Sequence, residues 1–261
     1  MFRLLASSLL LASGLLATAA PPLREAPNPT AITANQLVVS GNACGPTALL
    51  NAFRFGNPEW QRASNAITGE TDKQRIYTII REYGMRPSVA IKGRPRWSKK
   101  GVNLTDLCDI ANEMTRGHYL PQVSQEVLFR TSGETPEKLL KRVHARLNTS
   151  LEKGLPPIIS LRRFVKRGKL WVPLDAHFVT VTAIPRKLEK GSGSFAISYI
   201  DPWGGKACQG SIVIPQHPVL ADTPGDSPCL EADFPQASVG KKLVRAGEPT
   251  ALTLAAVLGR W

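Results

Sequence analysis

Cys44 is the first residue in the chain whose setting could support chemistry. It lies between a small-residue turn and an apolar run typical of a helix, in the stretch GNACGPTALLNAF at 41–53. A thiol becomes a strong nucleophile only when ionised, and its pKa falls at a helix N-terminus or beside an imidazolium. Gly41 and Gly45 would let the backbone approach a substrate closely. Cys44 is therefore open to three interpretations: a core residue, half of a disulfide, or a nucleophile.

A catalytic thiol also needs a histidine, and the chain offers four. His118 follows a helix end, His144 lies on a cationic helix that we expect to present it to solvent, and His217 lies in a loop. His177 alone begins an apolar strand, in DAHFVTVTAI. At the rim of a sheet it could face a cleft while its neighbours hold it rigid. His177 is therefore the candidate base.

An acidic residue follows where the next predicted strand ends, in the segment YIDPWGG. Asp201 could accept a hydrogen bond from the His177 ring, fix its tautomer and steady the imidazolium. By itself this segment is only a strand end with a turn. Taken together, the order of a helix-opening cysteine, a strand-opening histidine and a strand-ending acid predicts a triad of Cys44, His177 and Asp201.

The segments NACGPTALLNAF, DAHFVTVTAI and YIDPWGG resemble the Cys, His and Asp boxes of papain-like cysteine peptidases, and more closely those of the C39-like branch. The match covers roughly residues 40–205, the size of one catalytic domain. The resemblance implies Cys44 as nucleophile, His177 as general base and then acid, and Asp201 as the orienting group. It implies neither a cofactor nor a metal.

One position departs from the family pattern, which usually supplies an oxyanion-stabilising glutamine shortly before the cysteine. At the spacing seen in many members this chain has Val38. Gln36 is the nearest candidate and would require a bulge in the loop. Asn42, together with the backbone N–H of Cys44, is the alternative.

The chain divides into a helical first half and a strand-rich second half. Helix signals predict helices beginning at Cys44 and over 71–84, 104–116 and 135–147. Strand signals predict strands at 157–161, 169–172, 176–181 and 195–200, with further edges at 211–214 and 242–244. We therefore expect an α+β fold, in which a helical half carrying the cysteine helix packs on a C-terminal antiparallel sheet. The resemblance implies that this fold is papain-like.

The first residues follow the plan of a secretory signal peptide: an early cation at Arg3, a short apolar run and an Ala17-Thr18-Ala19 cleavage site. We expect 1–19 to be the signal peptide, 20–39 a Pro-rich exposed lead, and 40–261 one peptidase domain. Cleavage would leave a secreted or periplasmic protein with no integral membrane segment. A retained N-terminal anchor is the alternative.

An exported protein can form disulfides, and the chain has four cysteines. Cys208 and Cys229 lie in a turn-rich segment and are the pair that we expect to be joined, although four cysteines allow three connectivities. Cys108 lies on the apolar side of a predicted helix and is expected to be a buried small hydrophobe. With no CxxC in the sequence, neither a zinc ribbon nor a thioredoxin-type site is indicated.

The chain is basic, with a formal net charge of +13, and 43% of its residues are hydrophobic. The apolar content argues for a globular protein, and the charge would favour adhesion to acidic cell-envelope polymers. The loop at 92–100 gathers cations around Trp97, either as a solvated loop or as a contact patch. No helix-turn-helix, RNP or zinc-finger pattern indicates nucleic-acid binding.

The function predicted from the sequence is an exported cysteine peptidase that cleaves peptide or protein substrates through a thioester acyl-enzyme. A transglutaminase-like acyl transferase would use the same three residues, because only the entry of water or of an amine distinguishes the two reactions. A catalytically silent envelope-binding module is the third hypothesis. The intact triad argues against it, since binding does not require all three residues.

Overall fold

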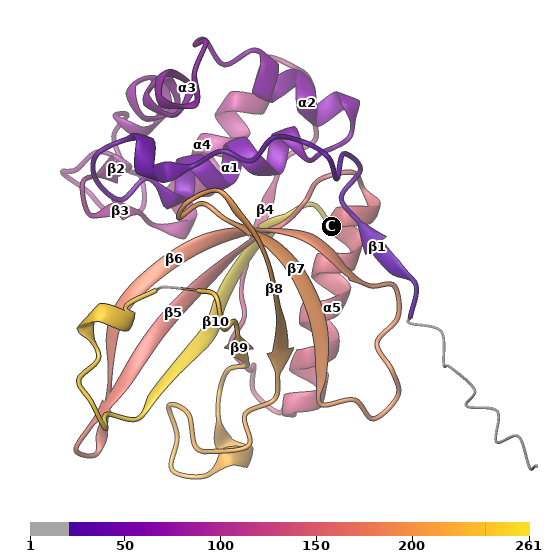
Figure 1. Cartoon of the computed structure of the whole chain (residues 1–261), viewed down its shortest axis with the longest axis vertical. Coiled ribbons are helices and arrows are strands. Elements are labelled where there is room, and N and C mark those ends of the chain that lie inside the picture. The colour runs from indigo at the N-terminus through magenta and orange to yellow at the C-terminus, as the bar shows by residue number, and fades with distance from the viewer. Residues whose placement is uncertain (1–20, 238) are drawn as a thin grey trace, which may run out of the picture.

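A computed structural model describes residues 21–237 and 239–261 of the chain. The N-terminal helices form a layer over one end of a strongly curved antiparallel sheet, and a long helix lies along the sheet (Figure 1). The predicted α+β class is confirmed. The expected signal peptide and its cleavage site lie outside the described residues.

The α-helices of the described residues all lie before residue 153, and the long strands of the sheet all follow it. The helices are α1 (Cys44–Arg54), α2 (Pro58–Asn65), α3 (Asp72–Ile79), α4 (Leu104–Arg116) and α5 (Pro136–Glu152). The strands are β1 (Leu23–Glu25), β2 (Trp97–Ser98), β3 (Gly101–Val102), β4 (Ser124–Val127), β5 (Ile158–Arg167), β6 (Leu170–Pro185), β7 (Ser194–Asp201), β8 (Lys206–Val213), β9 (Glu231–Asp233) and β10 (Thr250–Gly259). A π-helical turn at Ile80–Gly84 extends α3, and 3-10 helices form at Gln36–Val38, Pro224–Asp226 and Lys241–Leu243.

Side-chain caps explain why most helix starts were predictable. Thr71 and Gln74 form a reciprocal capping box at α3, and Asn103 accepts the first-turn N–H of Asp106 at α4 over 2.9 Å. Helix α1 differs, because its N-cap residue Ala43 makes no side-chain capping hydrogen bond. Its first-turn N–H groups are therefore left without a side-chain cap.

The large sheet curls round until its two ends meet. Its strands follow the order β1-β6-β5-β10-β9-β8-β7, and β6 pairs with β7 as well. The predicted strands within 157–200 are present as β5, β6 and β7, each longer than predicted, and the two strands predicted at 169–172 and 176–181 are joined in β6. Strand β10, which pairs with β5, β9 and β4, was not predicted. The segment expected as a strand at 242–244 instead lies largely in a 3-10 helix.

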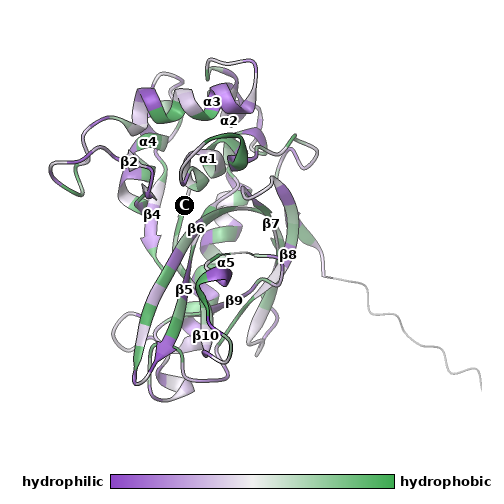
Figure 2. Ribbon diagram, turned by 60° about the vertical axis from the view of Figure 1, so that its left-hand side comes forward, coloured by the Kyte–Doolittle hydropathy of each residue, from purple (hydrophilic) through white to green (hydrophobic). Residues whose placement is uncertain are grey.

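From His177 onward, strand β6 is buried on both faces, and this part joins the two halves of the molecule. Phe178 belongs to the hydrophobic cluster of the helical half. Val179 and Val181, which point the other way, belong to the cluster between the sheet and α5. A strand buried on both sides needs a nearly continuous apolar run, which the sequence after His177 provides. Figure 2 shows α1 in hydrophobic colours where it lies over this end of the sheet.

The expected lead at 20–39 is not an exposed tether over the part that the structure describes. Strand β1 pairs with β6, where Leu23 lies opposite Pro185. Farther along, Ala34 and Gln36 are buried, at 0% and 3% exposure. This segment is therefore part of the domain, because its backbone groups pair with the sheet and its small side chains fill the core.

The expected disulfide between Cys208 and Cys229 is not formed; all four cysteines are buried free thiols. Cys208 packs in the main cluster of the sheet. Cys229 belongs to a separate small cluster with Val219 and Ala251. Each thiol is enclosed by apolar neighbours of its own, as the sequence predicted only for Cys108.

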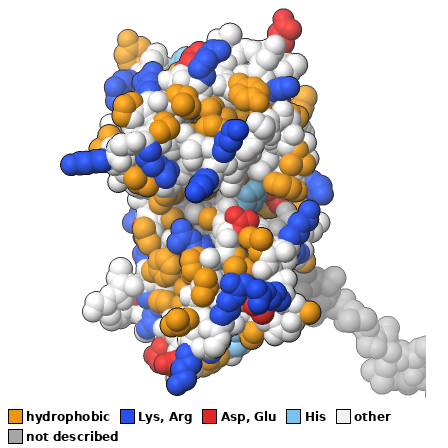
Figure 3. All heavy atoms as spheres, turned by 90° about the vertical axis from the view of Figure 1, so that its left-hand side faces the viewer, with side chains coloured by type: hydrophobic (Ala, Val, Ile, Leu, Met, Phe, Trp, Pro, Cys, Tyr) orange, Lys and Arg blue, Asp and Glu red, His pale blue; other side chains and the backbone are white. Residues whose placement is uncertain are grey.

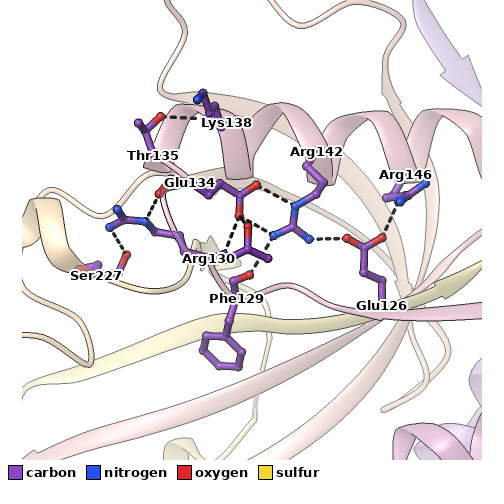
Figure 4. A network of polar contacts seen from close by, with 10 residues as sticks. Glu126, Phe129, Arg130, Glu134, Thr135, Lys138, Arg142, Arg146 and Ser227 are labelled. Carbon is purple, nitrogen blue, oxygen red and sulfur yellow. Dashed lines mark hydrogen bonds and ion pairs between the residues drawn. The ribbon is translucent and has the colours of Figure 1, made fainter.

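An ion-pair network holds the segment before α5 against that helix (Figure 4). Arg142 on α5 donates two hydrogen bonds to Glu134, both over 2.8 Å, and also contacts Glu126. Arg146, one turn later, contacts the second oxygen of Glu126. The hydrogen bonds from Arg142 lower the pKa of Glu134 to about 2. Because Glu126 lies on β4, which pairs with β10, the network also ties β4 to α5.

Among the described residues, we find no helix with both the length and the apolar character that crossing a membrane requires.

Close packing, rather than substrate approach, explains Gly45. A side-chain carbon built at Gly45 would lie 2.4 Å from Cγ1 of Val102 and 3.2 Å from Cδ1 of Leu107. Such a contact is far shorter than van der Waals distance, so only glycine lets α1 approach β3 and α4 this closely. The expectation that Gly45 serves substrate access is corrected accordingly.

We therefore expect Gly45→Ala to lower the free energy of unfolding by about 1–3 kcal/mol, the usual range for overpacking a core. Urea denaturation followed by circular dichroism measures this change. Gly117→Ala is the matched control, because nothing lies within 4 Å of the added carbon there. Shortening the facing side chain in Gly45→Ala/Val102→Ala should recover part of the loss. Equal effects at Gly45 and Gly117 would contradict the packing argument.

Candidate active site

Cys44 is the first residue of α1 and is 3% exposed. The N–H groups of the first turn and the helix dipole create a positive potential that favours an anion at this position. Since Ala43 supplies no capping side chain, these groups are not already committed to one. The sequence-based placement of Cys44 at a helix N-terminus is thus correct.

One hydrogen bond joins the cysteine helix to the histidine strand. The Thr180 hydroxyl on β6 donates to the backbone carbonyl of Ala48 on α1 over 2.9 Å, and both residues are fully buried. Thr180 lies one residue past Val179 and three past His177, while Ala48 lies one helical turn past Cys44. The bond therefore fixes the position of α1 along the length of β6, and this position brings Cys44 close to His177.

His177 and Asp201 meet across neighbouring antiparallel strands. Thr180 pairs with Ile200, so the register continues with Asp201 beside Val179. His177 and Asp201 therefore lie at the same end of the β6–β7 pairing. Nε2 of His177 lies 2.7 Å from Oδ1 of Asp201. Both side chains are buried, with relative exposures of 7% and 3%.

The turn after β7 also holds Asp201 in place. Its Oδ1 accepts a second hydrogen bond, from the backbone N–H of Trp203, over 2.8 Å. The backbone of the turn thus orients the carboxylate. Trp203 also lines the neighbouring cleft.

His177 contacts Cys44 as well as Asp201, and the electrostatics favour the imidazolium. Burial, the largest contribution, lowers the pKa of His177, but hydrogen bonds to Asp201 and Cys44 and the charges of both raise it to about 10. Because Nε2 faces Asp201, the nitrogen left for Cys44 is Nδ1. The ring thus bridges a thiol and a carboxylate, which is the arrangement that activates a nucleophilic cysteine.

The other three cysteines lie in surroundings that oppose ionisation. Burial raises the pKa of Cys108 to about 11 and that of Cys229 to about 12. Burial also raises the pKa of Cys208. Cys44 is the one cysteine of the four that contacts an imidazolium.

A cleft of ≈ 720 Å³ opens beside His177. Figure 3 shows this side of the molecule, with histidine and acidic side chains between the helical and sheet halves. Cys44, which is 3% exposed, is not one of the residues that line the cleft. The lining residues are Gln36, Gly41, Asn42, Lys99, Asp175, Ala176, His177, Trp203 and residues 239–243.

Both candidate oxyanion donors line this cleft. Gln36 is buried, and its Oε1 has no hydrogen-bond partner among the described residues. No hydrogen bond to this oxygen therefore fixes the orientation of the side-chain amide. The backbone of Asn42 is fully engaged, since its N–H donates to Lys99 O and its carbonyl accepts from the Trp97 indole, each over 3.0 Å. Gln36 begins the 3-10 helix Gln36–Val38 in the loop before Cys44.

Gln36 is positioned by a segment that we call the clamp, residues 33–36. Its own backbone N–H donates to Pro202 O over 2.9 Å, in the turn that follows Asp201. Asn35 accepts from Gly204 over 3.1 Å, and Thr33 donates to the carbonyl of Gly205 over 2.7 Å. The clamp therefore places Gln36 relative to Asp201.

Asn51 ties the same clamp to α1. Its Oδ1 accepts the N–H of Ala34 over 2.7 Å, and its Nδ2 donates to the carbonyl of Ala34 over 3.3 Å. Asn51 is 0% exposed and lies two turns from Cys44 on the same helix. Sequence reasoning missed this residue, although a buried amide within the apolar run LLNAF must find partners and was a signal to follow.

Two other sequence-based expectations about histidine and tryptophan are revised. His144 is buried rather than solvated: Nε2 lies 2.8 Å from the carbonyl of Pro185, and burial lowers its pKa.

Trp97, from the basic loop, packs beside Gly41, where an added side-chain carbon would lie 3.4 Å from the indole. Gly41 itself has a φ of 89°, a conformation that favours glycine. The loop thus supports the approach to Cys44.

Comparison with known proteins gives no match: no family model, no curated protein and no solved structure resembles the chain significantly. Any function must therefore be argued from the geometry of the site.

We expect Asp201→Asn to lower the pKa of His177, because the mutation removes the carboxylate charge that stabilises the imidazolium. The histidine ring of the unmodified protein should stay protonated until about pH 10. NMR titration of ¹⁵N-labelled imidazoles measures both values. His144 provides an internal control, since its pKa is lowered by burial and should not respond to the substitution. A His177 that titrates near 6.5 in both proteins would contradict the described bridge.

Proposed function

We propose that this protein is a papain-like cysteine peptidase that cleaves amide bonds through Cys44, His177 and Asp201. The observation that carries the proposal is one buried imidazole that bridges Asp201 at 2.7 Å and the cysteine at the start of α1. The cleft beside it offers space for a peptide. The proposal includes export, which rests on the signal sequence alone.

In the proposed reaction, the Cys44 thiolate attacks the carbonyl carbon of the substrate and forms a C–S bond. The carbonyl oxygen becomes an oxyanion, which the Cys44 N–H and the Gln36 amide would stabilise. The His177 imidazolium then gives its proton to the leaving nitrogen as the C–N bond breaks. A thioester and a neutral imidazole remain.

The electrostatics explain how a strongly held proton is released at this step. Contact with Cys44 is one of the influences that raise the pKa of His177. Attack turns the thiolate into a neutral thioether-like sulfur, so this support is lost and the ring becomes a stronger acid. Its pKa thus falls at the moment when the leaving nitrogen needs a proton.

Hydrolysis of the thioester restores the site. His177 takes a proton from water, and the hydroxide attacks the thioester carbonyl. The second tetrahedral intermediate collapses with release of the Cys44 thiolate, and the imidazolium is again in place. An amine that entered instead of water would give transfer, so acceptor amines should be included in the first assays.

A silent binding module is less well supported by this geometry. Burying a histidine and a carboxylate removes both from water at a cost, and apolar residues would fill the same volume more stably. The arrangement at the edge of a cleft is better accounted for by catalysis, for which perturbed titratable groups are typical.

We expect Cys44→Ala to abolish cleavage of a peptide mixture, while Cys108→Ala retains it because Cys108 lies away from the cleft. Mass spectrometry of the products, and of the enzyme for the trapped thioester, measures both steps. In addition, iodoacetamide at pH 6 should label Cys44 in preference to the other three cysteines and lose this preference in His177→Ala. Full turnover by Cys44→Ala would rule out the proposal. Products joined to an added amine would reveal transfer.

Removal of the oxyanion donor should slow turnover without disturbing the thiol. Gln36→Ala is expected to reduce kcat by about 10²–10³, the usual loss for one such donor. Iodoacetamide labelling of Cys44 should remain, which shows that the ion pair is intact. Asn42→Ala is the matched comparison, because Asn42 lines the same cleft. A large loss at Asn42 and none at Gln36 would reassign the donor.

A further inference from the structure

We propose that the cleft selects peptides with acidic side chains close to the bond that is cleaved; this inference rests on the proposed function. The argument begins with Lys99 and Lys242, which both line the cleft. They come from opposite halves of the molecule, because Lys99 follows β2 and Lys242 lies in the 3-10 helix after β9. A bound chain would therefore meet a cation on either side.

The two lysines are not neutralised by the surrounding residues. Neither Lys99 nor Lys242 forms an ion pair within residues 21–237 and 239–261. Their neighbour Lys241 differs, because its ammonium donates to the carbonyl of Pro235 over 2.8 Å. Lys99 and Lys242 thus remain available to a ligand.

The one acidic residue in the lining has a structural task. Oδ1 of Asp175 accepts the N–H of Ala176 over 2.8 Å, and Oδ2 accepts the N–H of Gly240 over 3.0 Å. Gly240 has a φ of 60° and could not carry a side chain freely, since an added carbon would lie 3.1 Å from Cβ of Asp175. Asp175 therefore anchors the wall at 239–243 and is itself partly screened.

Both lysines are placed close to the reacting groups by backbone contacts. The carbonyl of Lys99 accepts the N–H of Asn42, two residues before Cys44. The wall that carries Lys242 is held by Asp175, two residues before His177. The cations thus flank the position of the scissile bond, where they would attract carboxylates and repel other cations.

The same lining gives the substrate an apolar requirement. Trp203 and Leu243 both line the cleft and are 46% and 54% exposed. Large apolar groups left open to water in a concave site are typical of ligand contacts. We therefore infer a peptide with an apolar residue near one or two acidic ones, in preference to a uniformly charged polymer. Figure 3 shows basic side chains on both halves of this face.

The test is a set of peptides that differ only in Glu, Gln or Lys at positions beside a mapped cleavage site. We expect kcat/KM to fall from Glu to Gln to Lys by about 1.5- to fivefold per step, the range for exposed charge pairs. In Lys99→Glu/Lys242→Glu the order should reverse. Lys190→Glu is the matched control, since Lys190 is exposed in the turn between β6 and β7. Equal rates for the Glu and Lys peptides would overturn the inference while leaving the peptidase proposal intact.

Binding separates the two proposals if no peptide is cleaved. Fluorescence anisotropy with Cys44→Ala should show tighter binding of the Glu peptide than of the Lys peptide, weakened by salt. The double lysine variant should lose this preference. Such binding without cleavage would support a cleft that selects acidic peptides and would reject the peptidase. If heparin bound and none of the peptides did, and this binding required the same lysines, the ligand would be a charged polymer. That result would overturn the inference.

Discussion

The hydrogen bond from Thr180 to the carbonyl of Ala48 is the contact on which the site depends. The helical half and the sheet half meet mainly through apolar packing, which is strong but does not fix register along a strand. A buried hydroxyl has one place where its bond can be satisfied, so it specifies how far α1 is advanced along β6. Phe178 then packs among the helices while His177, one residue earlier, is left at the rim facing Cys44.

A second layer of constraints runs through the clamp at residues 33–36. It is bonded to Asn51 on the cysteine helix and to the turn that follows Asp201. Gly205 in that turn has a φ of 62°, and a side chain there would lie 3.2 Å from the carbonyl of Ala34. One short stretch therefore connects Gln36, the helix that carries Cys44 and the turn that follows Asp201. Movement of any of them would be transmitted to the other two.

The sequence predicted the parts of the structure that local signals specify. Capping residues such as Thr71 and Asn103 indicate where their helices begin, and the apolar run after His177 indicates a strand buried on both faces. Strand β10 was missed because its alanine-rich sequence, TALTLAAVLG, lacks the clear alternation of a strand with one exposed face. Likewise, nothing local shows that the lead pairs with β6, since its partner at Pro185 is distant in the chain.

The candidate site was predicted only as a set of residue types, because what joins them is tertiary. The order of Cys44, His177 and Asp201 in the chain indicates a triad, but the clamp, Asn51 and the lysines of the cleft contribute through contacts across the fold. The Cys208–Cys229 pairing failed for the same reason: proximity in the sequence says little about which core each thiol enters.

Charge balance links the buried triad to the surface around it. In the proposed ion-pair form, Cys44 and Asp201 would carry two negative charges and His177 one positive charge, so the buried group would be anionic overall. The uncapped N-terminus of α1 and the lysines at 99 and 242 add positive potential around it. The same field would stabilise an oxyanion and attract an acidic peptide. If the proposed function holds, catalysis and substrate choice share one electrostatic origin, the positive potential around Cys44, His177 and Asp201.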